Sequence, residues 1–184
     1  MLEMFVRECV KEGRFVSPNE HERKEIIDRL SDDYLKFVLG PAAADDKRFM
    51  HTYANMVKTV SFAAENLCKE FEKSDFTPSG FEYKIGLANE DIPAIEYDVD
   101  GKRVYLRGSI DRVDTCEANG TKYVRVVDYK TYSKDFVAEK VAYGLDTQLL
   151  HYLYAYCEKN NTIPAGVFYY GVTLPNVNIT GRET

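Results

Sequence analysis

Residues 108–130 read GSIDRVDTCEANGTKYVRVVDYK, and this stretch decides the fold. Asn119-Gly120 suits the left-handed backbone of a tight two-residue turn. The segments on either side, Arg103–Glu117 and Thr121–Thr131, are therefore predicted to be the two strands of an antiparallel hairpin. A turn of this length also sets the register, because residues equidistant from it must face each other.

The predicted register brings charged side chains together. Asp111 faces Asp128 and Ser109 faces Lys130, so that Asp111, Asp128 and Lys130 share one face. Directly opposed side chains have Cβ atoms about 4.5–5.5 Å apart, where like charges are destabilising. A hard divalent cation such as Mg²⁺ or Mn²⁺ offsets this repulsion, because it prefers carboxylate and water oxygens. The pattern predicts a metal site, with Lys130 placed to hold a water molecule or a phosphate oxygen beside it.

A third acidic residue comes from the strand predicted at residues 81–87. Phe81, Tyr83 and Ile85 alternate with polar residues, which is typical of a half-buried strand. Glu82 is predicted to point away from these three side chains, which makes it a further candidate carboxylate for the site.

Two other interpretations of the acidic pair stay open. Asp111, Asp128 and Lys130 are also consistent with a solvated hairpin face, on which Lys130 neutralises one acid. A β-bulge in either strand would remove the register on which the argument depends. The strongly β-forming run from Val124 to Tyr129 favours an enclosed site, since a bare surface does not require it.

The rest of the chain divides into a helical first half and a mixed second half. Apolar spacing predicts one helix over residues 2–12 and a long one over 46–73. Between them, Ser17 as cap and Pro18 predict the start of a helix that ends at about Leu30. A short helical turn is predicted over 32–39. Further strands are predicted at 95–99 and 166–172, a second hairpin turn at Asp100-Gly101, and a helix over 146–159. This order predicts a single α+β domain over residues 1–184, helical over about 1–75, with a mixed central β-sheet and its helices over about 76–175.

Length and composition exclude several classes of protein. The chain has 184 residues, enough for one domain, and its 45% hydrophobic and 29% charged residues are typical of a soluble globular protein. No apolar run approaches the roughly 18 residues of a membrane span, and the N-terminus lacks a signal-peptide pattern, so we expect a cytoplasmic protein with no membrane partner. The formal net charge of −6 argues against nucleic acid as partner. Residues 102–140, however, hold nine Lys and Arg against six Asp and Glu, so the net negative charge of the chain is concentrated outside this segment, which contains the predicted hairpin.

The four cysteines are dispersed along the chain. Cys9, Cys68, Cys116 and Cys157 form no C-x-x-C pair, which excludes the usual zinc and redox motifs. They are predicted to be buried or half-buried free thiols.

Three motifs occur in a fixed order, and they carry a resemblance to a known family. They are GSIDRVD at residues 108–114, VDYKT at 127–131 and QLLHY at 148–152. They resemble the G-x-I-D-R-x-D, hydrophobic-D-Y-K-T and Q-L-x-x-Y motifs of RecB-type nucleases of the PD-(D/E)xK superfamily. The similarity is greatest to the C-terminal nuclease domain of the AddB or RexB type, and it runs from the first helix to about Pro175.

The resemblance implies a restriction-endonuclease-like fold and a metal-dependent nuclease site. It implies that Asp111 and Asp128 bind Mg²⁺ or Mn²⁺, and that the carbonyl oxygen of Tyr129 completes the metal shell. It also makes Glu82 a further acidic member of the site. Lys130 is implied to orient the attacking water or to stabilise charge on the phosphate.

The third motif places two polar side chains on one helix face. Gln148 and Tyr152 are four residues apart, and the resemblance implies that their helix borders the active site and touches DNA or the catalytic Lys130. The alternative is that both are polar helix residues packed under the sheet. The implied reaction is hydrolysis of a phosphodiester by metal-activated water.

The resemblance also implies a biological setting. The expected protein is a DNA exonuclease domain of an ATP-dependent helicase–nuclease that processes double-strand breaks for recombinational repair, with DNA and the A subunit of the same helicase–nuclease complex as partners. The alternatives are a free-standing or phage RecB-like nuclease, and a catalytically silent nuclease-like module that binds DNA or serves as a scaffold.

Two features of the family pattern are missing. RecB-type domains carry a metal-binding histidine in the first helix, immediately before the position where this chain begins with Met1, and His51 and His151 do not match it. Both are predicted to be ordinary surface or core histidines. The AddB type also holds an iron–sulfur cluster, whose C-terminal cysteine group is missing here. We therefore expect a domain excised from a larger protein, and the cluster, if there is one, belongs to that parent.

Overall fold

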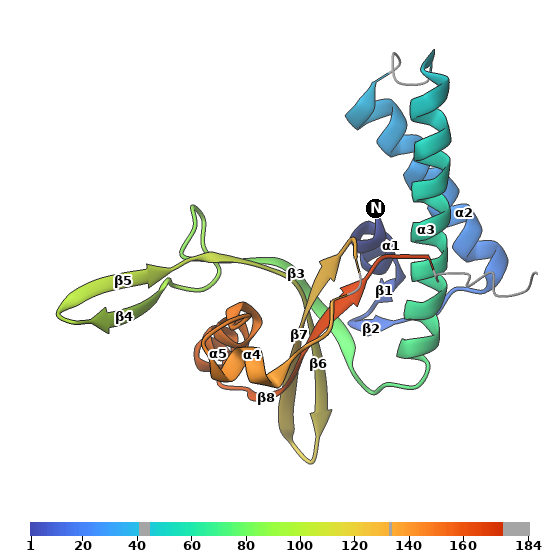
Figure 1. Cartoon of the computed structure of the whole chain (residues 1–184). Helices are drawn as coiled ribbons and strands as arrows, with labels where there is room; N and C mark the ends of the chain where they lie inside the picture. The colour runs from blue at the N-terminus through green and yellow to red at the C-terminus, as the bar shows by residue number, and fades with distance from the viewer. Residues whose placement is uncertain (41–44, 133, 175–184) are drawn as a thin grey trace, which may run out of the picture.

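The computed structural model describes residues 1–40, 45–132 and 134–174. The chain combines helices with a mixed four-stranded sheet, which confirms the predicted α+β, restriction-endonuclease-like class (Figure 1). The elements are α1 (Leu2–Cys9), β1 (Val10–Lys11), β2 (Arg14–Phe15), α2 (Glu20–Asp33), the π-helix η1 (Tyr34–Leu39), α3 (Lys47–Phe71), β3 (Thr77–Ile85), β4 (Ile95–Val99), β5 (Lys102–Leu106), β6 (Gly108–Ala118), β7 (Thr121–Lys130), α4 (Ala138–Ala142), α5 (Gln148–Asn160) and β8 (Ile163–Gly171).

The first helix ends earlier than its apolar spacing predicts. It stops at Cys9, because Val10–Lys11 pairs with Arg14–Phe15 in a short hairpin. This hairpin turns at Glu12 and Gly13, both of which have positive φ. Periodicity alone does not report such a pairing, since alternating and helical patterns are indistinguishable over two residues.

The start of α2 corrects a second prediction. The cap is Asn19 rather than Ser17: the Asn19 side chain accepts a hydrogen bond from the Glu22 N–H, and the Glu22 side chain accepts one from the Asn19 N–H, each at 3.0 Å. The helix thus begins with a capping box slightly later than predicted. The Ser17 hydroxyl instead donates to Glu72 at the end of α3. The long helix α3 agrees with its prediction, and Asp46 caps it.

The main sheet has the strand order β3-β6-β7-β8. Strand β6 is antiparallel to both β3 and β7, whereas β8 runs parallel to β7 after the crossover through α5. The segment predicted as one strand over Arg103–Glu117 is divided into β5 and β6. Strand β5 pairs with β4 across the predicted Asp100-Gly101 turn, and this second hairpin projects from the sheet (Figure 1).

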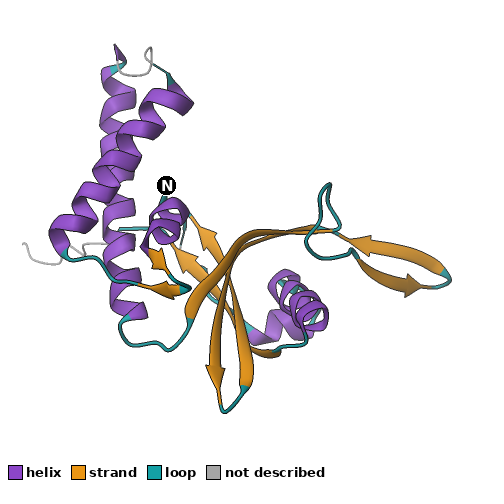
Figure 2. Cartoon of the chain, turned by 180° about the vertical axis from the view of Figure 1, so that it is seen from behind, coloured by secondary structure: helices purple, strands orange, loops and turns teal. Residues whose placement is uncertain are grey.

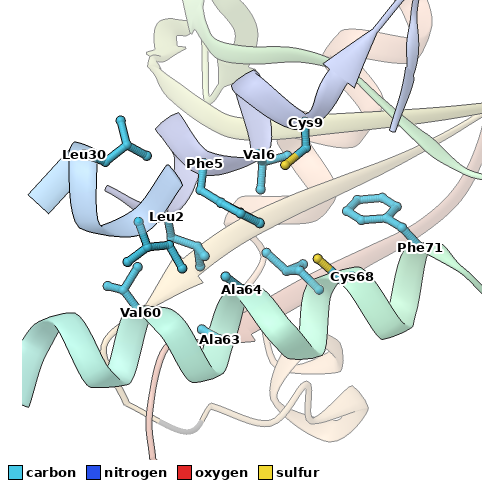
Figure 3. Packing of buried hydrophobic residues seen from close by; sticks show 12 residues of the cluster. Leu2, Phe5, Val6, Cys9, Leu30, Val60, Ala63, Ala64, Cys68 and Phe71 are labelled. Carbon is cyan, nitrogen blue, oxygen red and sulfur yellow. The ribbon is translucent and has the colours of Figure 1, made fainter. Parts of the chain in front are cut away.

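Helices cover the two faces of the sheet (Figures 1 and 2). On one face, apolar residues of α1 pack against α3, with Phe5, Val6 and Leu67 fully buried (Figure 3). On the other face, α5 packs against β6 and β7, where Leu149 and Val126 belong to the second buried cluster. None of the helices in the described ranges combines the length and the apolar content that a membrane span requires.

Strand β3 does not alternate as predicted. Phe81 packs against the α1/α3 cluster, whereas Tyr83 and Ile85 belong to the cluster under α5. The residue between them, Glu82, has a φ of 52°. A left-handed residue inside a strand changes the direction of the chain, so the side chains on either side of it no longer share a face.

Candidate active site

The hairpin of β6 and β7 has the predicted register. Its pairs run from Ala118–Thr121 to Arg112–Val127, on either side of the Asn119-Gly120 turn. Beyond Arg112–Val127 the contact changes: the Asp111 carboxylate accepts a hydrogen bond from the Tyr129 N–H at 2.8 Å. This acidic side chain therefore holds the end of β7 at the point where the ladder ends.

Asp111 lies close to other charges. Its burial raises the pKa of this carboxyl, and the bond from the Tyr129 N–H opposes that change. The negative charge of Asp128 raises the pKa further, and Lys130 lowers it. A weaker raising effect comes from Glu3 in α1. Asp128 is therefore close enough to Asp111 for its charge to act on the Asp111 carboxyl in the folded chain.

Asp128 and Lys130 form an ion pair on β7. The distance between Lys130 Nζ and Asp128 Oδ2 is 2.5 Å, and the contact raises the pKa of Lys130. Asp128 is 8% exposed, and the Lys130 ammonium group is the partner of its Oδ2 atom among the described residues. A buried carboxylate oxygen of this kind is costly unless a cation lies against it, and Lys130 is that cation in this structure.

The donor set fits a hard divalent cation in part. Two carboxylates, Asp111 and Asp128, and the nearby carbonyl of Tyr129 are oxygen donors of the type that Mg²⁺ and Mn²⁺ prefer. Within residues 1–40, 45–132 and 134–174, however, no group of three or more His, Cys, Asp or Glu side chains has a metal-binding arrangement. Glu82 thus does not join the two aspartates in this structure; it is exposed at its left-handed position on β3. Its role as a further acidic member of the site stays a prediction.

The QLLHY motif contacts the GSIDRVD motif. The Gln148 side chain donates to the Tyr152 hydroxyl at 2.8 Å, and Tyr152 is buried. A Cβ atom on Gly108 would lie 1.8 Å from that hydroxyl, so only glycine fits there. No hydrogen bond joins either α5 residue to Lys130 in the described part of the chain. The structure therefore places both at the start of β6, next to a hollow of about 430 Å³ that Gln148 and Arg107 help to line.

Sequence reasoning missed a buried ion network behind the site. Asp114 is fully buried and accepts from Arg112 Nη2 at 3.1 Å and from Arg125 Nε at 2.8 Å. Arg125 also pairs with Glu70 of α3 at 2.7 Å, and Arg112 donates to the Tyr129 hydroxyl at 2.7 Å. The network thus joins α3 to Tyr129, which lies between Asp128 and Lys130 on β7. Part of the signal was in the hairpin register, which sets Asp114 opposite Arg125.

A second missed residue is Glu3, whose charge acts on Asp111 although the two residues are far apart in sequence. Glu3 accepts a hydrogen bond from Arg7 at 2.7 Å, and the Arg7 guanidinium lies over the Phe81 ring. No local pattern indicates this proximity, because it depends on how α1 packs against β3.

The histidines and cysteines have the structural roles predicted for them. His151 shares a 2.7 Å hydrogen bond with the Tyr97 hydroxyl, which joins α5 to the β4–β5 hairpin, and His51 is exposed on α3. The cysteines are free thiols, all buried except the half-buried Cys116. Burial raises the pKa of the Cys9 thiol to about 12.

Comparison with known proteins adds the family. The model of the PD-(D/E)XK nuclease superfamily matches residues 1–183. The chain is 31% identical to the B subunit of the ATP-dependent helicase/deoxyribonuclease of Acetivibrio thermocellus over 100% of this chain and 17% of that protein. It is 34% identical to the protein of the same name from Ruminiclostridium cellulolyticum over 87% of this chain and 14% of that one.

The chain therefore spans less than a fifth of the length of these relatives. The family match covers nearly all of it, and it includes the hairpin with Asp111, Asp128 and Lys130. On this match and on the mixed sheet that carries the hairpin, the chain belongs to the PD-(D/E)XK nuclease superfamily, as a domain related to the AddB-type subunits of helicase–nucleases.

Proposed function

We propose that this domain hydrolyses DNA phosphodiester bonds with the help of Mg²⁺ or Mn²⁺. The observation that carries the proposal is the meeting of Asp111, Asp128 and Lys130 at the end of the β6–β7 hairpin. Two neighbouring carboxylates, of which Asp128 raises the pKa of Asp111, with a lysine beside them, are suited to a metal ion and a phosphate. The match to a nuclease superfamily supports the same conclusion.

Each residue has a role in the proposed reaction. Asp111, Asp128 and the carbonyl of Tyr129 would hold the metal, which when bound supplies a Lewis acid and an activated water. Lys130, which pairs with Asp128 in this structure, would orient the attacking water or stabilise charge on the phosphate. Gln148 is proposed to contact DNA from the N-terminal turn of α5.

The proposal extends to a larger assembly. Relatives that are named as the B subunit of a helicase/deoxyribonuclease support a module that works with an A subunit in the cytoplasm. We propose that the module acts as an exonuclease and processes DNA double-strand breaks for recombinational repair. We propose no iron–sulfur cluster on the residues that the structure describes, because the four cysteines, all among them, do not form a group.

A cleavage assay tests the proposal. End-labelled single-stranded and duplex oligonucleotides are incubated with the 184-residue chain and Mg²⁺ or Mn²⁺. We expect cleavage that EDTA abolishes, and a loss of roughly 100-fold or more in Asp128→Asn and Lys130→Gln. Glu158→Gln, an exposed acid near the end of α5, is the matched control and should cleave at the wild-type rate.

A second measurement separates an enzyme from a silent module. Calorimetry with Mn²⁺ alone should show binding to the wild-type chain that Asp111→Asn loses. A chain that binds DNA but does not bind Mn²⁺ and does not cleave would be a scaffold. A chain whose Asp128→Asn variant cleaves normally would have its active site elsewhere.

A further inference from the structure

A second lysine lies near Lys130 and takes no part in the proposed reaction. Lys134 follows β7 by four residues, and its ammonium group lies 4.2 Å from the centre of the Tyr169 ring. Lys130 Nζ lies 5.9 Å from the centre of the same ring. Tyr169 is on β8 and is the register partner of Asp128. The two ammonium groups are therefore gathered at one aromatic side chain beside the candidate metal site.

Lys134 already has a counter-ion. Its Nζ atom lies 3.0 Å from Asp146 Oδ1, and Lys140 Nζ lies 4.0 Å from the other oxygen of the same carboxylate. The pair raises the pKa of Lys134 and lowers the pKa of Asp146. Asp146 stands two residues before Gln148 and has a φ of 53°, a conformation that costs free energy in a residue other than glycine.

This pair remains within reach of solvent. The Lys134 side chain is 22% exposed and the Asp146 side chain is 30% exposed. Asp146 also lines the hollow of about 430 Å³ together with Arg107 and Gln148. Lys130 and Lys134 thus share the Tyr169 ring, and Asp146, the partner of Lys134, lines the same hollow as Arg107.

We propose that Lys134 binds a DNA phosphate next to the one at Lys130, and that Asp146 is the counter-ion that this phosphate replaces. The inference rests on the proposed function and extends it to a second phosphate. Exchange of a carboxylate for a phosphate leaves the ammonium group paired, so the step avoids the cost of an unpaired charge. Phosphates of one strand follow each other about every 3.4 Å along a duplex axis, and the Tyr169 ring keeps both lysines within the span of a short run of them.

The competing explanation is structural. An ion pair between Lys134 and Asp146 also clamps the segment after β7 to the start of α5. The two explanations predict opposite effects of losing Asp146 on the affinity for DNA. If the pair is only a clamp, loss of either residue loosens the same segment and weakens DNA binding. If Asp146 competes with DNA for Lys134, its loss strengthens DNA binding.

The test measures binding of a dye-labelled single-stranded oligonucleotide by fluorescence anisotropy in EDTA, so that cleavage plays no part. Lys134→Gln should weaken binding by roughly 3–10-fold at low salt, and it should reduce the slope of log K against log salt by about 0.7. Asp146→Asn should tighten binding by roughly 2–5-fold, because it removes the competitor of the phosphate. In the Lys134→Gln background, Asp146→Asn should change nothing. Lys134→Arg should retain binding.

Matched controls come from the far end of α5, where Lys159→Gln and Glu158→Gln should have much smaller effects. Weaker DNA binding in Asp146→Asn would refute the replacement of Asp146 by a phosphate and would support a purely structural ion pair. Equal tightening in both backgrounds would show a general charge effect and would also overturn it. If the wild-type chain binds DNA and Lys134→Gln behaves like Lys159→Gln, this inference alone is refuted. A wild-type chain that binds no DNA refutes the proposed function as well.

Discussion

Replacing Asp114 by asparagine tests how much the buried ion network of Asp114, Arg112 and Arg125 stabilises the folded chain. The carboxylate is fully buried and receives two guanidinium groups, from Arg112 and Arg125, at 2.8–3.1 Å. Asparagine keeps the size of the side chain and removes its charge. Glu70 then remains as an acidic partner for Arg125, and Arg112 loses its carboxylate.

The expected loss is large because the charges are buried. Breaking a buried ion pair by neutralising one partner costs about 3–5 kcal/mol, since the remaining charge is uncompensated. In urea the free energy of unfolding of a small protein falls by about 1–3 kcal/mol per molar. The unfolding midpoint of Asp114→Asn should therefore fall by about 1 M or more, as measured by circular dichroism or tyrosine fluorescence.

Two further variants make the result specific. Glu117→Gln, on the exposed end of the same strand, should stay within about 0.5 kcal/mol of wild type. Arg112→Met added to Asp114→Asn should recover part of the loss, because it removes the guanidinium group that has lost its carboxylate. A loss below about 1 kcal/mol in Asp114→Asn, or additive effects in the double variant, would refute the reasoning.

Three other predictions follow from single contacts. Asn19→Ala should lower the free energy of unfolding by about 1 kcal/mol while Asn19→Asp keeps it, because aspartate also caps a helix; equal losses in urea unfolding would contradict the capping box. Gly108→Ala should lower the melting temperature by several degrees, because its Cβ would meet the Tyr152 hydroxyl at 1.8 Å; an unchanged melting temperature would show that the contact relaxes freely. At pH 8, iodoacetamide should modify Cys116 before Cys9, because burial raises the pKa of Cys9 to about 12 and only thiolates react. Alkylation should rise with pH, and mass spectrometry that found Cys9 modified first would contradict the burial.

Much of the site was predictable because it depends on a local turn. Asn119-Gly120 adopts positive φ values, and the register that follows from it holds as far as Arg112–Val127. The β6–β7 ladder ends there, so the facing pairs Asp111–Asp128 and Ser109–Lys130 stay predictions. The helix cap was harder, since Ser17 and Asn19 both suit the start of a helix; in the structure Asn19 forms the capping box and Ser17 donates to the distant Glu72.

The strand that carries Glu82 shows where local reasoning fails. Its alternation predicts one shared face for Phe81, Tyr83 and Ile85, but they divide between two cores. The left-handed conformation of Glu82 causes the division. No residue type in the strand indicates it, because glutamate rarely adopts this conformation without support from tertiary packing.

The local sequence was enough to predict the β6–β7 hairpin and its register as far as Arg112–Val127, because a two-residue turn and strand periodicity act between near neighbours. The distant groups that meet near the end of this hairpin follow from tertiary packing. Glu70 reaches Arg125, Glu3 acts on Asp111, and Tyr169 gathers two lysines, each through packing of elements that lie far apart in the chain. Such contacts depend on how helices and strands dock against one another, and sequence periodicity reports which face of an element is buried but not what it is buried against.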